Sequence, residues 1–314
     1  MIANPQEMRA LTQGLANSTW TLGAIGALLE SGLVEHLREP HAIDELATRC
    51  PGLSRSRVER VLAVAAAVGV VVAEGTQYRL APGAMPFAQA PMRSALQADL
   101  RASLMQALAL LDASTGPVPQ QGWKHTNPAV LQAQGDASAM FPPMFKANMI
   151  ASLGDLAERL DRPGARFLDI GVGVASLAIA MCRTWPGMRV VGVDTYEVPL
   201  AMARQNVDRA GLADRIELRR LAVQDLTDEE SFEAVWMPSF FIAPSVIAAA
   251  VARVHASLRP GGWLLFPVGG LAGGDEKSRA VFALITDFWG GPVLTIADAE
   301  SLLKGAGFTE VRVL

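Results

Sequence analysis

The sequence predicts an α/β protein, in which a doubly wound parallel sheet follows a mostly helical domain. Two observations predict this fold. From about residue 165 onward, short apolar runs typical of strands alternate with helical stretches, as they do in parallel sheets. Before residue 160 the apolar residues recur mainly at helical spacing. The length of 314 residues also favours two domains over one.

We expect three segments: a helical domain over residues 1–112, linker helices and a substrate-lid loop over 113–160, and a ligand-binding catalytic domain over 161–314. In the first segment, leucines recur at helical spacing over residues 21–37. A short helix follows over 43–50, and Ser54 is placed to cap a third helix that ends near Gly69. A hairpin turning at Glu74-Gly75 comes next. Three helices and a hairpin are the arrangement of a winged helix.

A long helix is predicted over residues 94–112, with one leucine stripe. The stripe consists of Leu96, Leu100, Leu104, Leu108 and Leu111. An exposed stripe of this size is unusual in a monomer, so we expect a homodimer formed through the N-terminal domain and this stripe. The Pro/Gly-rich stretch 114–128 is a loop, and Asn127-Pro128 begins the next helix.

The predicted strands of the second part end in a common edge where ligands bind. Helical stretches are expected between the first five of them. The predicted strands are 166–170, 189–193, 215–220, 233–237, 263–268 and 309–313.

Composition excludes several classes of protein. A net charge of −4 and a pI near 5.7 argue against a nucleic-acid partner. Cys50 and Cys182 lie far apart without metal-ligand spacing, so we expect no metal and no disulfide. The first residues lack the basic and apolar runs of a signal peptide, and the longest apolar run, 61–73, is too short for a membrane span. We expect a cytoplasmic protein with no membrane partner.

The stretch FLDIGVGVASLAIA, residues 167–180, carries the most specific motif. Asp169, Gly171, Gly173 and Ala175 lie where the first strand turns into a helix. Glycines there allow a sharp turn and close approach of a ligand. The next strand ends in Asp194, whose carboxylate can accept both hydroxyls of a ribose.

This motif resembles that of the class I S-adenosylmethionine-dependent methyltransferases. SLRPGGWLLF, residues 257–266, resembles the segment that enters their fifth strand, and the winged-helix segment resembles the dimerisation domain of small-molecule O-methyltransferases. The resemblance implies S-adenosyl-L-methionine as cofactor. Asp169, Gly171, Gly173 and Ala175 would hold its methionine end. The other parts of the cofactor would contact further residues: the ribose Asp194 and Tyr196, the adenine Val223, Gln224 and Asp225, and the sulfonium Trp236.

The O-methyltransferases that this chain resembles commonly place a histidine after the fourth strand. Residues 235–244, VWMPSFFIAP, contain no His, Asp or Glu. His125, on the Pro/Gly loop, is the one histidine with a route to a substrate and is the candidate catalytic residue. The alternative is that His125 is a solvated loop histidine without a catalytic role. The candidate substrate walls are Phe240 and Phe241 on one side, and Trp123, Met140, Phe141, Met144 and Phe145 on the other.

We therefore predict methylation of a small, flat, aromatic or apolar metabolite of secondary metabolism, at a nitrogen, a carbon or an acidic oxygen. Two alternatives remain open: a ligand-sensing transcription regulator that reads DNA through Arg55, Arg57 and Arg60, and an enzyme of this fold with non-methylating chemistry. A dinucleotide-dependent dehydrogenase fits less well, because its motif needs glycine where Ser176 stands.

Overall fold

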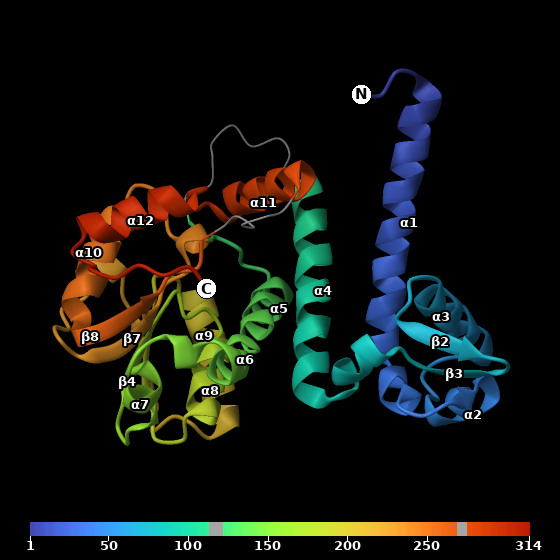
Figure 1. Cartoon of the computed structure of the whole chain (residues 1–314), viewed down its shortest axis with the longest axis horizontal. Helices are drawn as coiled ribbons and strands as arrows, with labels where there is room; N and C mark the ends of the chain where they lie inside the picture. Colours follow the sequence, from blue (N-terminus) through green and yellow to red (C-terminus); the bar gives the residue numbers. More distant parts are fainter. Residues whose placement is uncertain (113–121, 269–274) are drawn as a thin grey trace. The chain divides into compact units, whose positions relative to one another are not determined.

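The computed structural model describes residues 1–112, 122–268 and 275–314, and these form two compact units, residues 1–104 and 105–314 (Figure 1). The residues predicted as the lid, 113–121, lie outside the described part. The first unit ends inside a long helix, at Leu104, eight residues before the predicted boundary at 112. Gln106 of that helix already belongs to the second unit, where it bonds to the side chains of Gln134 and Trp289. No helix in the described residues is long and apolar enough to cross a membrane.

The first unit is helical with a small antiparallel sheet of order β1-β3-β2. Its elements, in chain order, are α1 (Pro5–Glu30), η1 (Leu33–Leu37), β1 (His41–Ala42), α2 (Ile43–Arg49), α3 (Arg55–Ala67), β2 (Val71–Glu74), β3 (Gln77–Leu80), η2 (Pro82–Ala88) and α4 (Ala90–Asp112). Ser54 caps α3 as predicted, and the hairpin forms between β2 and β3. The predicted helical N-terminal domain is confirmed.

The first helix differs from the prediction. It begins at Pro5, where Asn4 accepts the backbone N–H of Glu7 at 2.9 Å, and ends at Glu30 instead of continuing to residue 37. The break occurs at Gly32, whose φ of 74° is left-handed. A residue in that conformation ends an α-helix, and glycine adopts it without steric cost. Residues 33–37 consequently form a separate 3₁₀ turn.

The second unit is a doubly wound α/β domain built on five parallel strands. Its elements, in chain order, are α5 (Pro128–Ser138), α6 (Phe141–Asn148), η3 (Ile150–Ser152), α7 (Leu156–Asp161), β4 (Arg166–Ile170), α8 (Ser176–Thr184), β5 (Arg189–Asp194), α9 (Glu197–Ala210), β6 (Ile216–Arg220), η4 (Val223–Asp225), β7 (Phe232–Trp236), η5 (Ser239–Phe241), α10 (Ile247–Ser257), β8 (Leu258–Leu265), α11 (Glu276–Trp289) and α12 (Ile296–Gly305).

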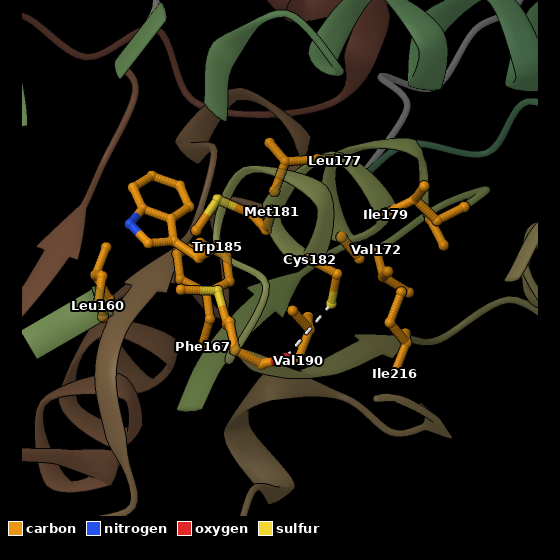
Figure 2. Packing of buried hydrophobic residues seen from close by; sticks show 14 of the residues in the cluster. Leu160, Phe167, Val172, Leu177, Ile179, Met181, Cys182, Trp185, Val190 and Ile216 are labelled. Carbon is orange, nitrogen blue, oxygen red and sulfur yellow. Dashed lines mark hydrogen bonds between the residues drawn. The ribbon is translucent and has the colours of Figure 1, made fainter. Parts of the chain in front are cut away.

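The strand order is β6-β5-β4-β7-β8, so the chain reverses direction across the sheet between β4 and β7. Helices α8 and α9 cover one face of the sheet, and α10 and α12 cover the other (Figure 1). Figure 2 shows the first of these cores, where Phe167 and Val190 of the strands meet Met181 and Cys182 of α8. Their burial is the main stabilising contribution of this layer, about 1.5–3 kcal/mol for each large apolar side chain.

Two predictions about the sheet are wrong. Only the 3₁₀ turn η4 lies between β6 and β7, where a helix was expected, because the connection is short and the chain must cross to the far side of β4. Residues 309–313 do not form the sixth strand. Val311 packs against the core, and Arg312 donates to the carbonyl of Ser152 at 2.5 Å and lies over the Trp263 ring, so side chains hold this segment without a ladder.

Candidate active site

The glycine-rich loop follows β4 and is built from left-handed backbone. The φ values of Gly171, Gly173 and Ala175 are 72°, 54° and 66°. Left-handed geometry is easy for glycine and unusual for alanine. Ala175 is held in it by a 2.8 Å hydrogen bond from its N–H to the carbonyl of Val172, and its side chain is fully buried. The loop therefore turns back on itself and opens α8 at Ser176.

Asp194, the last residue of β5, fixes this loop from the neighbouring strand. Its two carboxylate oxygens accept the backbone N–H groups of Gly173 and Tyr196, each at 3.0 Å. Burial raises the pKa of Asp194 above its usual value, while these N–H donors oppose the rise. Each oxygen retains a second lone pair that can accept a ligand hydroxyl.

Asp169, the fourth residue of β4, is the most perturbed acid of the site. It is 2% exposed, and its Oδ2 has no hydrogen-bond partner among the described residues. Burial first, and the charge of Asp194 second, raise its pKa to about 8. A buried carboxyl oxygen without a partner is costly. Its position in the wall of a cavity makes it a group that a bound ligand can satisfy.

A cavity of about 420 Å³ opens at the carboxyl ends of these strands. It lies at the reversal between β4 and β7, where Asp169 and Trp236 are paired in register, which is where open α/β sheets bind ligands. It brings together eleven of the predicted residues: Asp169, Gly171, Gly173, Asp194, Tyr196, Val223, Gln224, Trp236, Trp123, Phe240 and Phe241.

Seven other predicted residues do not line this cavity. The side chain of Ala175 is buried behind the loop, and Asp225 points to solvent at the end of η4. The remaining five are His125 and the α6 region, Met140, Phe141, Met144 and Phe145. Because α6 packs its apolar face onto α8, Phe145 lies in the core and Met144 on the opposite, exposed face. Phe141 contacts Trp236 from outside the cavity, at a ring distance of 4.4 Å.

Helix α5 forms a wall of the cavity that the sequence analysis missed. The lining residues from this helix are Leu131, Gln134, Gly135, Ala137 and Ser138. The signal was Gly135, a glycine inside a helical run, which often marks a close contact. A Cβ there would lie 2.3 Å from Val174 Cγ2 of the glycine-rich loop.

Polar side chains attach α5 to that loop. The hydroxyl of Ser176 donates to Asp136 at 2.7 Å, and the amide of Gln132 donates to the same carboxylate oxygen at 2.8 Å. From α9, Asn206 donates to Gln132 at 3.1 Å and to the carbonyl of Val174 at 2.9 Å. This network holds three helices around the turn (Figure 1).

Aromatic rings form the opposite wall. Trp289, at the end of α11, lies 5.1 Å from the Phe240 ring and 4.9 Å from the Phe241 ring, and Trp123 lies 5.1 Å from Phe241. The backbone of Gly291 approaches Phe240 so closely that a Cβ would meet its carbonyl oxygen at 2.2 Å. Glycine is thus required for α11 to end against η5.

His125 lies behind this wall. Its ring packs 4.3 Å from Trp123 and 5.0 Å from Phe288, and its buried Nε2 has no partner in the described residues. Burial lowers the pKa of His125, so the ring is neutral at pH 7. A neutral imidazole can accept a proton or a hydrogen bond, but His125 is outside the cavity lining.

Comparison with protein families decides the class of this site. Residues 167–262 match the model of a methyltransferase domain. The chain carries a class I methyltransferase domain. S-adenosylmethionine is the cofactor of this class. In the described residues no three metal-ligating side chains gather to hold a metal ion.

Similar proteins extend the comparison beyond that domain. The ubiquinone biosynthesis O-methyltransferase of Hahella chejuensis is 35% identical over 136 residues, which are 42% of this chain and 54% of that protein. The chain thus matches about half the length of this curated relative. A putative O-methyltransferase of Nostoc punctiforme superposes with a TM-score of 0.65 at 17% identity, covering 99% of this chain and 94% of that one. Human N-acetylserotonin methyltransferase, solved with S-adenosylmethionine, gives 0.59 at 18%, covering 99% and 94%. The folds of these two structures therefore match nearly the whole chain.

Proposed function

We propose that this chain transfers a methyl group from S-adenosylmethionine to a small, flat, apolar or aromatic metabolite. One observation carries the proposal. The cavity at the sheet reversal combines the buried carboxyl group of Asp169, whose Oδ2 has no partner in the part of the chain that the structure describes, with a second carboxylate, Asp194, and a left-handed glycine turn. These acceptor oxygens suit a ligand that is cationic at one end and carries ribose hydroxyls at the other.

The residues present fit this cofactor. Asp194 would accept the ribose hydroxyls with its remaining lone pairs, and Asp169 would face the cationic methionine end beside Gly171 and Gly173. Val223 and Gln224 line the part of the cavity proposed for the adenine. The side chains of Ala175 and Asp225 lie outside the lining, so we give them no direct contact in this proposal.

When bound, the sulfonium would supply an activated methyl group, which passes in line to the acceptor as the bond to the sulfur breaks and S-adenosylhomocysteine leaves. The chain contributes position and exclusion of water. Trp123, Trp236 and the Phe240–Phe241 pair form apolar walls in which a flat acceptor is held. No His, Asp or Glu follows β7 in the 235–244 stretch. We therefore propose an acceptor that brings its own nucleophile, such as an amine, an acidic phenol or an electron-rich carbon.

We also propose that the chain works as a homodimer through its N-terminal unit. The first sixteen residues of α1, 5–20, are all exposed. Met8, Leu11 and Leu15 lie on this part of the helix at three- and four-residue spacing. A helix of this length has little stability in water by itself, and an apolar stripe favours packing against another chain.

A DNA-reading role through the third helix is weakened at one of its three arginines, whereas Arg57 and Arg60 are exposed and make no ion pair with the described residues. Arg55 is paired with Asp44 and, at 3.3 Å, with Glu59. These carboxylates neutralise a side chain that a phosphate backbone would need. We therefore keep the enzymatic proposal.

Calorimetry tests the function directly. S-adenosylhomocysteine titrated into the purified protein should bind one molecule per chain, and S-adenosylmethionine should bind at the same site. Mass spectrometry of candidate acceptors after incubation should show a gain of one methyl group. Absence of saturable binding of either nucleoside would refute the proposal, and binding with a different mass change would indicate non-methylating chemistry.

A further inference from the structure

Three side chains from three helices form a hydrogen-bonded relay behind the cavity. Trp289 of α11 donates its indole Nε1–H to Oε1 of Gln106 in α4. Gln106 in turn donates from Nε2 to Oε1 of Gln134 in α5, at 2.7 Å. Gln106 is only 8% exposed, so its polar atoms depend on these two partners.

The direction of this relay follows from chemistry. An indole nitrogen can only donate, so the atom of Gln106 that faces Trp289 must be its oxygen. The amide nitrogen of Gln106 then faces Gln134 and must find an acceptor there. Gln134 consequently turns its oxygen toward Gln106. The orientation of both amides is thus set by the indole, independently of how amide atoms are assigned.

The consequence is a donor at the cavity. Gln134 lines the cavity, and its oxygen is engaged by the relay. Its Nε2, which carries two N–H donors, has no partner in the described part of the chain. Trp289 at the far end of the relay packs on Phe240 and Phe241, which line the acceptor side. The relay therefore connects Gln134 in the α5 wall, through Gln106 and Trp289, to the aromatic wall.

We propose that Gln134 is a specificity-determining residue, whose amide N–H binds a carbonyl or carboxylate oxygen of the methyl acceptor. Gln106 and Trp289 are positioning residues, because they hold the oxygen of Gln134 away from the cavity and leave its N–H groups facing the acceptor. The inference rests on the function proposed above. It narrows the acceptor from a flat metabolite to one whose ring carries an oxygen acceptor. A ligand that offers only a donor at this point leaves Gln134 unsatisfied and is disfavoured.

Two neutral probes measure whether the site prefers a hydrogen-bond acceptor or a donor, on protein saturated with S-adenosylhomocysteine. Acetophenone has a carbonyl oxygen as its one polar atom, whereas aniline chiefly donates. Dissociation constants come from ligand-observed NMR titration. The wild type should prefer acetophenone, and Gln134→Leu should reduce that preference about threefold to tenfold, the effect of one neutral hydrogen bond. Gln205→Leu, on an exposed position of α9, is the matched control and should change nothing.

Gln106→Glu distinguishes the relay from simple packing. An ionised carboxylate accepts from Trp289 but cannot donate to Gln134, whereas a protonated one could still donate, so this variant is titrated at alkaline as well as neutral pH. Gln134 must then turn its N–H groups toward Glu and its oxygen toward the cavity, so the preference should reverse in favour of aniline. Trp289→Phe keeps an aromatic ring without the donor and should reduce the preference without reversing it.

An unchanged preference in Gln134→Leu and Gln106→Glu overturns the inference, as does absence of saturable binding of both probes to the wild type. Calorimetry with S-adenosylhomocysteine on the same proteins separates the two proposals. If the nucleoside binds normally while the probe preference is unchanged, the inference fails and the proposed function stands. If Gln134→Leu instead lowers the affinity for S-adenosylhomocysteine about threefold to tenfold, the amide binds the carboxylate of the cofactor and not the acceptor, and the inference fails.

Discussion

The backbone N–H of Gly173 donates to a carboxylate oxygen of Asp194 at 3.0 Å, across 21 residues of sequence. The two halves of the nucleotide motif are therefore linked before any ligand is present. Asp194 has two tasks. One of its oxygens holds the turn through Gly173 and the other accepts from the N–H of Tyr196 before α9, and each oxygen keeps a lone pair for a ligand. This double role makes it the most sensitive residue of the cofactor site.

Asp194→Ala should weaken binding of S-adenosylhomocysteine by about 2–4 kcal/mol, because a charged acceptor for two hydroxyls is lost in a desolvated site. The protein should stay folded, which circular dichroism checks. Asp225→Ala is the matched control, since Asp225 is exposed at the same edge of the sheet and outside the cavity lining. Equal affinity of the Asp194 variant and the wild type in calorimetry would remove the central assignment.

Asp169 should make stability of the ligand-free protein depend on pH. Its pKa is raised to about 8, first by burial and then by Asp194, whereas an unfolded Asp titrates near 3.8. Between these values the folded state holds a proton that the unfolded state has lost. The stabilising contribution of this group is therefore complete below about pH 4 and is lost as the pH rises through 8.

Asp169→Asn should remove this dependence. Relative to the variant, the wild type should lose at least about 1 kcal/mol of unfolding free energy between pH 5 and pH 9, since one pKa unit corresponds to 1.36 kcal/mol. Urea titrations of both proteins at several pH values measure the difference. Parallel stability curves for the two proteins would show that Asp169 is ionised throughout this range and that the cavity is better solvated than its burial indicates.

Gly135→Ala should weaken S-adenosylhomocysteine about tenfold or more. A methyl group at this position would lie 2.3 Å from Val174 Cγ2, and Val174 is itself buried in the loop. The loop or α5 must shift, although alanine by itself favours a helix by about 1 kcal/mol. Gly14→Ala, inside α1 with no atom within 4 Å of the added Cβ, is the control and should leave binding unchanged. If both variants bind alike, α5 adapts freely and does not shape the cofactor site.

The sequence predicts most of what depends on local chemistry. The strands from β4 to β8, the left-handed turn at Gly171 and Gly173, and the Ser54 cap follow from residue patterns within a few positions. The α5 wall does not, because Gln134 reaches the cavity only through contacts with residues far away in the chain. Residues 309–313 alternate like a strand, but a strand needs a ladder partner, and no local pattern shows that Arg312 bonds elsewhere.

The N-terminal unit should assemble two chains. Light scattering at micromolar protein should give twice the monomer mass of 33.3 kDa. Leu11, which is 47% exposed on α1, tests the surface: Leu11→Glu should shift the equilibrium toward monomer. Gln13→Glu is the matched control and should do so less, because Gln13 is exposed on the opposite face of the same helix, away from Met8, Leu11 and Leu15. A monomer mass for the wild type would contradict the proposal.

The last prediction concerns whether His125 is a general base. A positioned base contributes typically 10²–10⁴ in rate. Nε2 of His125 is buried, has no partner among the described residues and belongs to a neutral ring that can accept a proton. Its ring nevertheless packs behind Trp123 and outside the cavity lining. An acceptor with its own nucleophile does not need this base.

Once an acceptor is identified, His125→Ala should lower kcat by less than about tenfold, because Trp123 packs more loosely. His125→Phe, which restores the aromatic contact, should recover much of that loss. A thousandfold loss of kcat in both variants, with unchanged affinity for S-adenosylhomocysteine, would instead make His125 the base. The acceptor would then be an alcohol or phenol that the enzyme must deprotonate.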